Sequence, residues 1–556
     1  MKNIITILAL TVVVIMVAAC GTAGGGAAGG AAAPQPADAG QAAAPAAQPA
    51  AEAGDNFNAH GYPIVNERIT LRGFGNINTT HSDWDTLLAF QVWEEKSNIS
   101  IDWEQVPNDA FTERRNLVFA SGMLPDFFYR SHIPVSDQIT HGGNGMLLRL
   151  NDLIDAYAHN FNDRVAEFPD ARRGITLPDG SIFSLPVVMP PDLPTIYQQG
   201  WMNHVWLERL GIPVPETTDE IKQALIAFRD FDANGNGDPT DEIPYSCRNR
   251  GTSIMRFTFG AFGIGNLGGV GMSAWVDQGP DGMVRFFPVT DEFRNQLEWI
   301  NSLWEEGLMD VEMFTQGAPE FTAKANQDLI GAFFSNDNNQ QLGALSYQFG
   351  QIRAPMGPDG HRAYNHIGSS VISGAFAISS SNPYPRETLR WVDFFYGYEG
   401  SRLIRIGVEG VTFDVMPDGS YRIIDDIMFN PDGLTVSQAM GRFAISFAGG
   451  GCPDFVFRSF ELARLPPESP EWMDFILQDL DPRFINPVFL FTAEEQAELN
   501  PIASDVVSYV DEMRVAFKTG TRSFDEWDDF VTQLERMNIQ RYVEIYQAAL
   551  DRFLAG

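Results

Sequence analysis

Residues 232–244 carry oxygen-bearing side chains at a spacing that suits a metal ion. Asp232, Asn234 and Asn236 stand at every second position, and Gly237 follows where such a loop must turn sharply. A hard cation such as Ca²⁺ takes six to eight oxygen ligands, which a flexible loop with a glycine at the turn can supply. All candidate ligands come from this one loop, and no separate acid, base or nucleophile accompanies them. The pattern therefore predicts a structural Ca²⁺ site rather than a catalytic centre.

The expected ligands are Asp232, Asn234, Asn236, the backbone carbonyl of Asp238, Asp241 and Glu242. The match to the EF-hand pattern is partial, because that pattern ends on a Glu at its twelfth position. Ile243 occupies the twelfth position here, so the coordination shell must close one or two residues earlier. Asn, Asp and Gly are also ordinary turn formers, and a solvated turn without a metal is the alternative interpretation.

A helix and a short apolar segment flank this loop. Thr217 and Glu220 form a capping box at the start of the helix. One face of the helix is apolar at helical spacing, through Ile221, Leu225 and Phe228. A cation in the loop would clamp the end of this helix to the following segment, 243–245.

Strand and helix patterns alternate in the first part of the chain. The order is strand, helix, strand, helix and strand, over 69–75, 83–93, 100–104, 109–121 and 125–130. This order predicts an α/β lobe with a mostly parallel sheet. Ligands of such sheets bind outside the carboxyl ends of the strands. We therefore expect the loop 76–83 and residues 129–131 to lie beside a binding site.

Size, charge and missing motifs limit the function. About 500 residues follow the N-terminal region, more than a single core accommodates, so at least two lobes are expected. The formal charge of −35 argues against nucleic acid, which needs a basic face. The sequence has no phosphate-binding loop, nucleophile elbow or His-Glu-x-x-His motif. A glycosidase-type carboxylate pair meets only in space and leaves no pattern, so a secreted glycan-active enzyme, a hydrolase or lyase, is the alternative function.

The N-terminus has the pattern of an exported lipoprotein. A signal peptide is expected over 1–19, with an apolar region that ends at small residues before Cys20. Val17 to Cys20 resemble the bacterial lipobox, whose cysteine is lipidated and becomes the new N-terminus. Residues 20–56 are mostly Ala, Gly, Pro and Gln, and they are expected to form a flexible lipid-anchored linker. Outside the cytoplasm Cys247 and Cys452 can form one disulfide, but only within bridging distance, which the sequence leaves open.

The chain resembles the lipid-anchored extracellular solute-binding proteins of bacterial ABC importers, family 1 type, in the branch that handles oligosaccharides. Seven segments carry this resemblance between about residue 65 and the C-terminus: 120–126, 150–157, 178–186, 206–211, 407–413, 517–520 and 547–553. The resemblance implies a protein that captures an oligosaccharide-like solute, most simply as a monomer, and delivers it to the ABC permease at the cell membrane without acting as an enzyme. It also implies that the cation is Ca²⁺. The loop has one more residue between Asp238 and Asp241 than is common in the branch.

The fold implied by the resemblance is an α/β, two-lobed, periplasmic-binding-protein-like clamshell with extra C-terminal helices. We expect residues 57–195 and part of 330–400 in the N-terminal lobe. Residues 196–330 and part of 400–556 are expected in the C-terminal lobe and its closing helices.

The solute-binding residues are expected among aromatic and polar side chains, because sugars present both C–H faces and hydroxyl groups. The candidates lie in loops at strand ends or on a strand that crosses between the lobes, and they are Trp84, Arg130, Tyr197, Trp201 and Trp275. Packing in a core is the alternative role for each of them.

Overall fold

The computed structural model describes residues 56–190, 199–247, 252–265, 274–335, 342–364, 371–432, 434–445, 451–464, 476–480 and 488–555. The predicted signal peptide, Cys20 and the linker lie outside these residues. Residues 56–556 form one compact unit. Within the described part, no helix combines the length and the apolar character needed to cross a bilayer.

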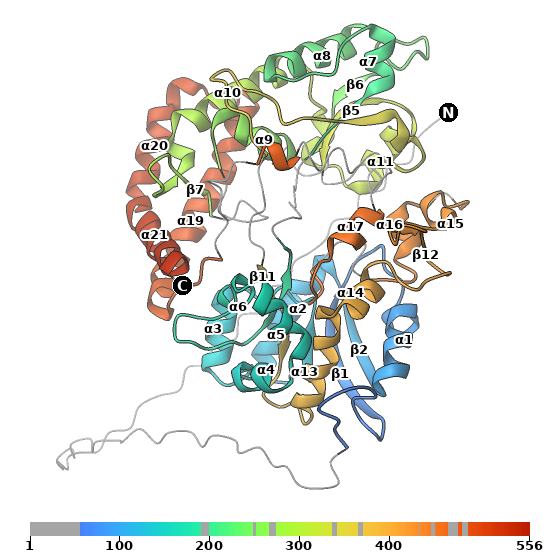
Figure 1. Ribbon diagram of the computed structural model, residues 1–556. Coiled ribbons are helices and arrows are strands. Elements are labelled where there is room, and N and C mark those ends of the chain that lie inside the picture. The colour runs from blue at the N-terminus through green and yellow to red at the C-terminus, as the bar shows by residue number, and fades with distance from the viewer. Residues whose placement is uncertain are drawn as a thin grey trace, which may run out of the picture. The chain divides into compact units, whose positions relative to one another are not determined.

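The N-terminal lobe is built on a five-stranded sheet in the order β2-β1-β3-β11-β4 (Figure 1). Its strands are β1 (Ile69–Ile77), β2 (Ile99–Pro107), β3 (Phe127–Tyr129), β4 (Leu185–Val188) and β11 (Val371–Ile378). Strand β1 runs parallel to β2 and β3, whereas β11 is antiparallel to both β3 and β4. Helices α1 (Leu88–Ser97) and α2 (Asn108–Ser121) lie between the first three strands along the chain. The predicted alternation of strand and helix is thus confirmed.

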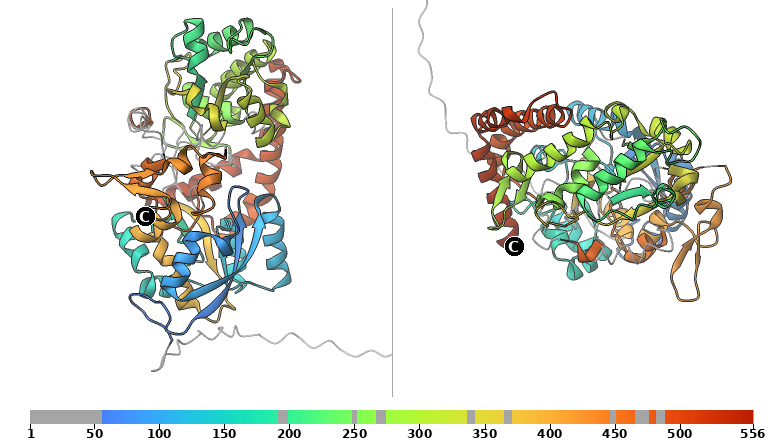
Figure 2. Two further views of the ribbon diagram at one scale, coloured as in Figure 1. Left: turned by 90° about the vertical axis from the view of Figure 1, so that its right-hand side faces the viewer. Right: turned by 90° about the horizontal axis from the view of Figure 1, so that it is seen from above.

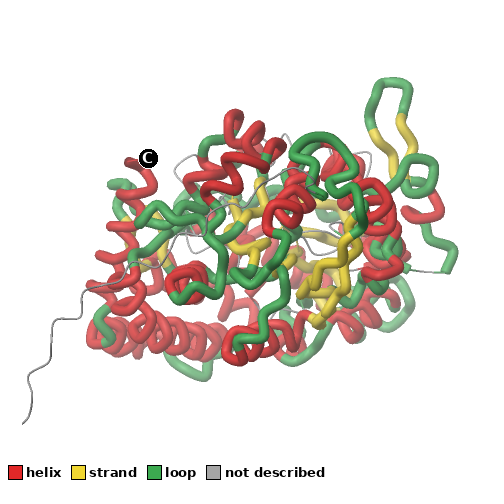
Figure 3. The backbone as a smooth tube through the Cα atoms, turned by 90° about the horizontal axis from the view of Figure 1, so that it is seen from below, coloured by secondary structure: helices red, strands yellow, loops and turns green. Residues whose placement is uncertain are grey.

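The C-terminal lobe has a four-stranded sheet in the order β10-β5-β9-β6. Its strands are β5 (Gln199–Asn203), β6 (Ile243–Tyr245), β9 (Ile330–Ser335) and β10 (Phe349–Ile352). Helices surround the strands of both sheets, as the red and yellow segments of Figure 3 show. Several helices belong to the C-terminal lobe. They include α8 (Thr218–Asp230), α10 (Asp291–Glu305), α19 (Ala493–Lys518), α20 (Trp527–Arg536) and α21 (Ile539–Ala555).

Each sheet has a hydrophobic core of its own. Buried apolar residues between 64 and 188 join others between 371 and 455 in the N-terminal lobe. The C-terminal core combines residues between 202 and 364 with residues between 476 and 550. The two-lobed α/β fold is therefore confirmed, and each lobe draws on two separate stretches of chain.

A separate small hydrophobic cluster is formed by buried residues between 406 and 463, next to the N-terminal lobe. It contains the hairpin β12 (Phe413–Val415) and β13 (Tyr421–Ile423) with α16 (Val436–Met440) and α17 (Arg458–Arg464). The hairpin stands out from the surrounding helices in Figure 2. Residues 454–456 extend from this region along strand β4: the N–H of Val188 donates to the carbonyl of Asp454, and the N–H of Val456 donates to that of Val188, each at 2.8 Å.

Local signals at helix ends agree with the sequence. Thr217 and Glu220 form the predicted capping box of α8. Gly122 and Gly211 end their helices with φ of +68° and +67°, in the left-handed region that glycine adopts without strain. Residues 178–180, Pro-Asp-Gly, form a turn in which the N–H of Gly180 donates to the carbonyl of Leu177 at 2.8 Å, and β4 pairs with the distant β11.

The buried carboxylate of Asp393 makes stability depend on pH. Asp393 ends α13 (Pro385–Asp393) and caps α5 (His159–Glu167), accepting the backbone N–H of Asn160 at 3.0 Å and of Phe161 at 2.8 Å. Burial raises its pKa to about 6. The folded protein therefore keeps this proton up to about pH 6, whereas the unfolded chain loses it near pH 4.

Raising the pH from about 4 to about 7 should therefore remove roughly 3 kcal/mol of stability through Asp393. Asp393→Asn should abolish this contribution, so its unfolding free energy should fall less than that of the natural protein over the same range. Urea denaturation at several pH values measures the difference. Asp432→Asn, at an exposed position, is the control. Parallel pH curves for the natural protein and Asp393→Asn would contradict the prediction.

Candidate functional site

In each sheet, the strands that run in the same direction have their carboxyl ends at the edge where the chain crosses between the lobes. The carboxyl ends of β1, β3 and β4 share one edge of the first sheet with the start of β11. In the second sheet the carboxyl ends of β6, β9 and β10 share an edge with the start of β5. The chain passes from β4 to β5 and later from β10 to β11, so both connections join these edges. We call them the carboxyl edges, and they are where open α/β sheets bind ligands.

The carboxyl edge of the first sheet has an unusual backbone after β3. Arg130 and His132 adopt φ of +52° and +44°, a conformation that costs free energy for residues other than glycine. Ser131 between them stays paired with β11, donating its N–H to the carbonyl of Ala375 at 3.1 Å. Such strain is found at binding sites more often than elsewhere, because it aims side chains that a regular strand would turn away.

A buried arginine holds this strained segment in place. Arg115 on α2 donates through Nη1 to the carbonyl of Ser131 at 3.0 Å and to that of His132 at 2.8 Å. Its Nη2 also lies 3.4 Å from a carboxylate oxygen of Asp137. The guanidinium group satisfies two carbonyls at once, so it stabilises the shape of the edge.

The side chains at this edge are suited to hydroxyl groups. Arg130 is buried, and its Nη1 donates to the backbone carbonyl of Asn76 at 2.8 Å. The side-chain oxygen of Asn76 is buried with no hydrogen-bond partner in the described structure. His132 is exposed at this edge, but desolvation by the surrounding protein and the positive charges of Arg130 and Arg115 lower its pKa to about 4. His132 is therefore neutral at pH 7 and can both donate and accept a hydrogen bond.

Trp201 lies at the carboxyl edge of the second sheet. It is on β5, and its indole N–H donates to the carbonyl of Ser335, at the end of β9, at 3.2 Å. Its ring is nearly parallel to that of Phe333, with 6.5 Å between the centroids, and the residue is partly exposed. Tyr197, predicted on the same strand, lies outside the described residues.

Trp84 and Trp275 are placed differently. Trp84 has no exposed surface, and its ring packs against Trp103 and Tyr129 with centroids 4.9 and 5.9 Å away. Trp275 is 1% exposed and lies in the C-terminal core against Phe287 and Phe293. Direct contact between a solute and the Trp275 ring would require this core to open.

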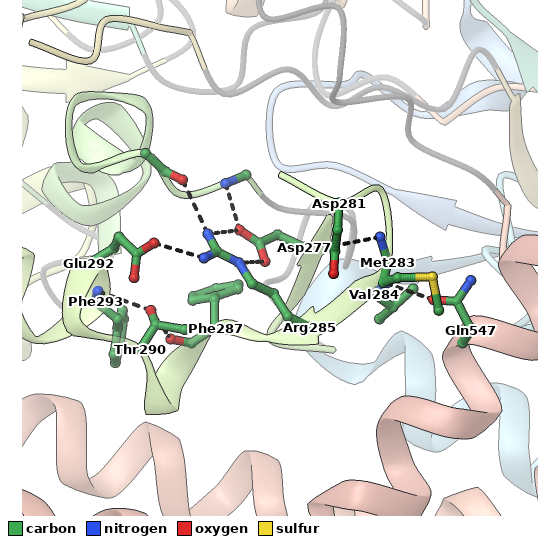
Figure 4. A network of polar contacts seen from close by, with 12 residues as sticks. Asp277, Asp281, Met283, Val284, Arg285, Phe287, Thr290, Glu292, Phe293 and Gln547 are labelled. Atoms are coloured by element: carbon green, nitrogen blue, oxygen red, sulfur yellow. Dashed lines mark hydrogen bonds and ion pairs between the residues drawn. The ribbon is translucent and has the colours of Figure 1, made fainter. Parts of the chain in front are cut away.

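An ion-pair network explains why Trp275 is held in the core. Trp275 precedes the hairpin β7 (Val276–Gln278) and β8 (Val284–Phe286). Arg285 contacts the two carboxylate oxygens of the buried Asp277 at 2.7 and 2.9 Å, and it contacts Glu292 on α10 at 2.8 Å (Figure 4). The two-pronged contact joins the two strands of the hairpin, and the contact with Glu292 joins the hairpin to α10. Together they fix the residue that leads into the hairpin.

The side chains of the loop 232–242 turn inward on one another. Asp232 Oδ2 accepts the N–H of Gly237 at 3.0 Å, and Asn234 Oδ1 accepts that of Asn236 at 2.9 Å. Asp241 accepts the amide groups of Asn234 and Asn236 at 3.1 and 2.7 Å. Gly237 has a φ of +93°, as the predicted sharp turn requires. The predicted ligand residues are thus brought together.

Two carboxylate oxygens of this loop are buried without a donor. Asp232 Oδ1 and Glu242 Oε2 have no hydrogen-bond partner in the described structure. Unmatched buried oxygens are unfavourable, and an oxygen-binding cation would satisfy both. Across the described ranges, no three His, Cys, Asp or Glu side chains form a metal-binding group. Besides these two carboxylates, the predicted ligands are the side-chain oxygens of Asn234, Asn236 and Asp241 and the backbone carbonyl of Asp238. A set made of oxygen atoms alone fits Ca²⁺.

Cys247 and Cys452 are not joined by a disulfide. Both are buried, Cys247 in the C-terminal core and Cys452 in the N-terminal core. The pairing considered from the sequence is therefore absent, because the two residues belong to different lobes.

Sequence reasoning did not single out Asn76, Arg115 or His132. Asn76 begins the loop that was expected beside the site. Its position in that loop was the one sequence feature that could have indicated a role in binding. Arg115 occupies an ordinary helical position, and His132 is an isolated histidine. Their roles depend on contacts with β1, β3 and β11 that no local pattern shows.

The chain is similar to solute-binding proteins of ABC importers, which are binding proteins and not enzymes. One relative is the fructooligosaccharide ABC transporter substrate-binding protein FusA of Streptococcus pneumoniae serotype 4, strain ATCC BAA-334 / TIGR4. It is 27% identical over 488 residues, which cover 84% of this chain and 87% of FusA. A solved structure of S. pneumoniae FusA in complex with kestose has a TM-score of 0.75 at 26% identity, covering 88% of this chain and all of that one. No family model matches the chain.

Other similar proteins support the same fold. The polygalacturonan/rhamnogalacturonan-binding protein YtcQ of Bacillus subtilis strain 168 is 22% identical over 347 residues, 60% of this chain and 65% of YtcQ. The alginate-binding protein AlgQ2, solved without calcium ion, has a TM-score of 0.72 at 23% identity, over 88% of this chain and all of AlgQ2. The solute-binding proteins of ABC importers to which this chain is similar work outside the cell membrane.

Proposed function

We propose that the protein captures an oligosaccharide between its lobes by lobe closure and delivers it to the transmembrane subunits of an ABC importer. The similarity to FusA over most of both chains carries this proposal, because FusA is a fructooligosaccharide-binding protein and one of its solved structures contains kestose. The alternative of a glycan-active enzyme loses its basis, since the relatives are binding proteins. The polar groups of the carboxyl edges can bind hydroxyls without breaking a bond.

The proposed solute-binding residues lie at the carboxyl edges. Arg130 and the neutral His132 supply donors and an acceptor from the first sheet, and Asn76 supplies a buried acceptor. Trp201 supplies a partly exposed aromatic face from the second sheet. Tyr197 stays a candidate on its sequence position. An aromatic face with converging polar groups is the arrangement that sugar rings require.

We also propose that Ca²⁺ occupies the loop 232–242. Its ligands would be Asp232, Asn234, Asn236, the carbonyl of Asp238, Asp241 and Glu242. A solved structure of FusA is an EF-hand mutant in complex with fructo-nystose, which supports a cation loop in this class. When bound, the ion supplies positive charge to the two unmatched carboxylate oxygens. The loop residues then hold the end of α8 to β6, which adjoins β9 in the sheet.

The attachment of the protein to the cell surface is a further part of the proposal. Residues 1–19 would be removed as a signal peptide, and Cys20 would carry the lipid. The Ala-, Gly- and Pro-rich linker to residue 56 would let the lobes move near the membrane. Mass spectrometry of the mature N-terminus tests this, because a lipidated Cys20 has a distinctive mass.

Trp201→Ala should weaken oligosaccharide binding about 10- to 100-fold, because a buried aromatic contact in a binding site contributes about 1.4–2.8 kcal/mol. A thermal-shift screen of saccharides identifies a ligand first, since a ligand that binds the folded state raises the melting temperature. Isothermal titration then compares the natural protein with Trp201→Ala. Trp304→Ala, which removes a partly buried tryptophan of α10, is the control. A melting temperature that no saccharide changes would overturn the proposed function, and equal affinities of both variants would overturn the role of Trp201.

A further inference from the structure

Residues 488–491, which lead into α19, pack into both lobes at once. Val488 and Leu490 pack against hydrophobic clusters of the N-terminal lobe. Phe489 and Phe491, which alternate with them, pack into the C-terminal core. Side chains that alternate between two sides are typical of extended backbone. The contacts with one lobe are therefore a single residue away from the contacts with the other.

Ring and side-chain contacts hold this segment on each side. The rings of Phe489 and Phe491 meet the ring of Tyr546 on α21 edge to face, with centroids 4.8 and 5.2 Å apart. On the other side Val488 lies against Gly174, which follows α6 (Asp170–Arg173). A Cβ at Gly174 would come within 3.0 Å of the Val488 side chain, so the glycine leaves room for this contact.

Arg552 on α21 fastens the backbone of the segment. Its Nη2 donates to the carbonyl of Leu490 at 3.0 Å, and its Nη1 donates to Glu495, in the first turn of α19, at 2.8 Å. The guanidinium group thus ties the segment to both helices and fixes the direction in which Leu490 points. The next residue, Phe553, also reaches the N-terminal lobe, because the guanidinium carbon of Arg173 lies 5.8 Å from the centre of its ring.

The connections described above join the lobes through more chain. Residues 189–198 lie between β4 and β5, and residues 365–370 lie between Tyr364 of the C-terminal core and Val371 of the N-terminal core. Consecutive Cα atoms are about 3.8 Å apart, and an extended chain spans at most about 3.3–3.6 Å per residue. Val488 and Phe489 therefore hold the lobes within one residue of each other, whereas the longer connections permit much larger separations.

We propose that residues 488–491 are the pivot of lobe closure and that Arg552 is the positioning residue that maintains it. Two bodies that are joined through adjacent residues cannot separate at that point, so the motion left to them is a rotation about it. A few residues that absorb changes in backbone angle are sufficient for such a hinge. The pivot rests on the proposed function, because lobe closure is part of it.

Distances between spin labels, measured by double electron–electron resonance, test the pivot without any solute. One pair, Asp170→Cys with Leu554→Cys, places labels at exposed positions on the two helices that meet beside the pivot. A second pair, Met123→Cys with Val214→Cys, places them at exposed positions of the two lobes outside these contacts. The mature chain with Cys20→Ala is used, since its other two cysteines are buried.

The pair beside the pivot should give one narrow distance distribution, and the second pair should give a broader one. Arg552→Gln releases the carbonyl of Leu490 and should broaden the distribution beside the pivot. Leu490→Ala removes the contact with the N-terminal lobe and should have the same effect, so one variant suffices if the other does not fold. Equal widths of the two pairs in the natural background, or a pair beside the pivot that stays narrow in the folded variants, would overturn the proposal.

Arg541→Gln is the matched control for Arg552→Gln. Arg541 also lies on α21 and contacts Glu498 of α19 through Nε at 2.8 Å, but the Leu490 carbonyl is bound by Arg552 instead. This variant should leave the distribution beside the pivot narrow. Equal broadening in both variants would mean that the two helices had loosened, and it would overturn the role of residues 488–491. Because no solute is added, this result is independent of the saccharide screen that tests the proposed function.

Discussion

Arg405→Ala should lower the free energy of unfolding by about 3–5 kcal/mol, the cost of removing one partner from a buried ion pair. Arg405 ends α14 (Tyr398–Arg405), and Asp454 opposite it has no exposed side-chain surface. The two nitrogens Nε and Nη2 contact the two oxygens of Asp454 at 2.7 and 3.0 Å, while Nη1 contacts Glu461 at 2.6 Å. Alanine would leave Asp454 buried without its guanidinium partner.

The loss of this ion pair should also affect the first sheet, because residues 454–456 lie beside strand β4 and form backbone hydrogen bonds with Val188. Urea denaturation followed by circular dichroism measures the loss. Arg422→Ala is the matched control: this arginine lies on β13, is about half exposed and contacts Asp414 at 3.4 Å. An exposed pair of this kind contributes about 0–1 kcal/mol. A similar change in both variants would contradict the assignment of stability to the buried pair.

Removing Ca²⁺ with a chelator should lower the melting temperature of the C-terminal lobe by about 5–10 °C. A ligand at one hundred times its Kd stabilises the folded state by about 2.7 kcal/mol, and each kcal/mol corresponds to roughly 2–4 °C in a domain of this size. The loop joins the end of α8 to β6, which is an edge strand. Loss of the ion should therefore loosen this edge of the second sheet first. Differential scanning calorimetry with and without Ca²⁺ measures the shift.

Asp232→Asn and Glu242→Gln should abolish this dependence on Ca²⁺, because each removes a carboxylate charge at nearly constant size. Asp418→Asn is the control, since Asp418 also lies in a turn and accepts the N–H of Ser420 at 2.9 Å. Its melting temperature should respond to Ca²⁺ as that of the natural protein does. If the natural protein melts at one temperature with and without Ca²⁺, the loop is an ordinary turn.

The local parts of the fold were predictable from the sequence. The capping box of α8 and the glycine ends of its neighbours involve residues a few positions apart, so short patterns contain their full cause. The loop 232–242 is similar, because the hydrogen bonds among its candidate ligands join residues that are close in sequence. Arg209, which donates to the carbonyl of Ala233, is the more distant partner. The proposed ligands of the loop could therefore be named from spacing alone.

The solute site was less predictable, because its parts meet only after folding. The shape of the segment after β3 depends on Arg115 from α2 and on β11. Strand β11 comes after all strands of the second lobe in the sequence. Trp84 and Trp275 illustrate the opposite problem. Each follows a pattern compatible with a binding site, yet burial is decided by ring contacts with residues of other elements, Tyr129 for Trp84 and Phe293 for Trp275.

The strand order also determines when the protein can fold during synthesis. Strand β11 sits between β3 and β4, but it is made only after every strand of the other sheet. The ribosome must therefore release nearly four hundred residues before the first sheet can be completed. The first sheet is completed by a strand that follows the other sheet in the chain, so no single cut yields two intact halves.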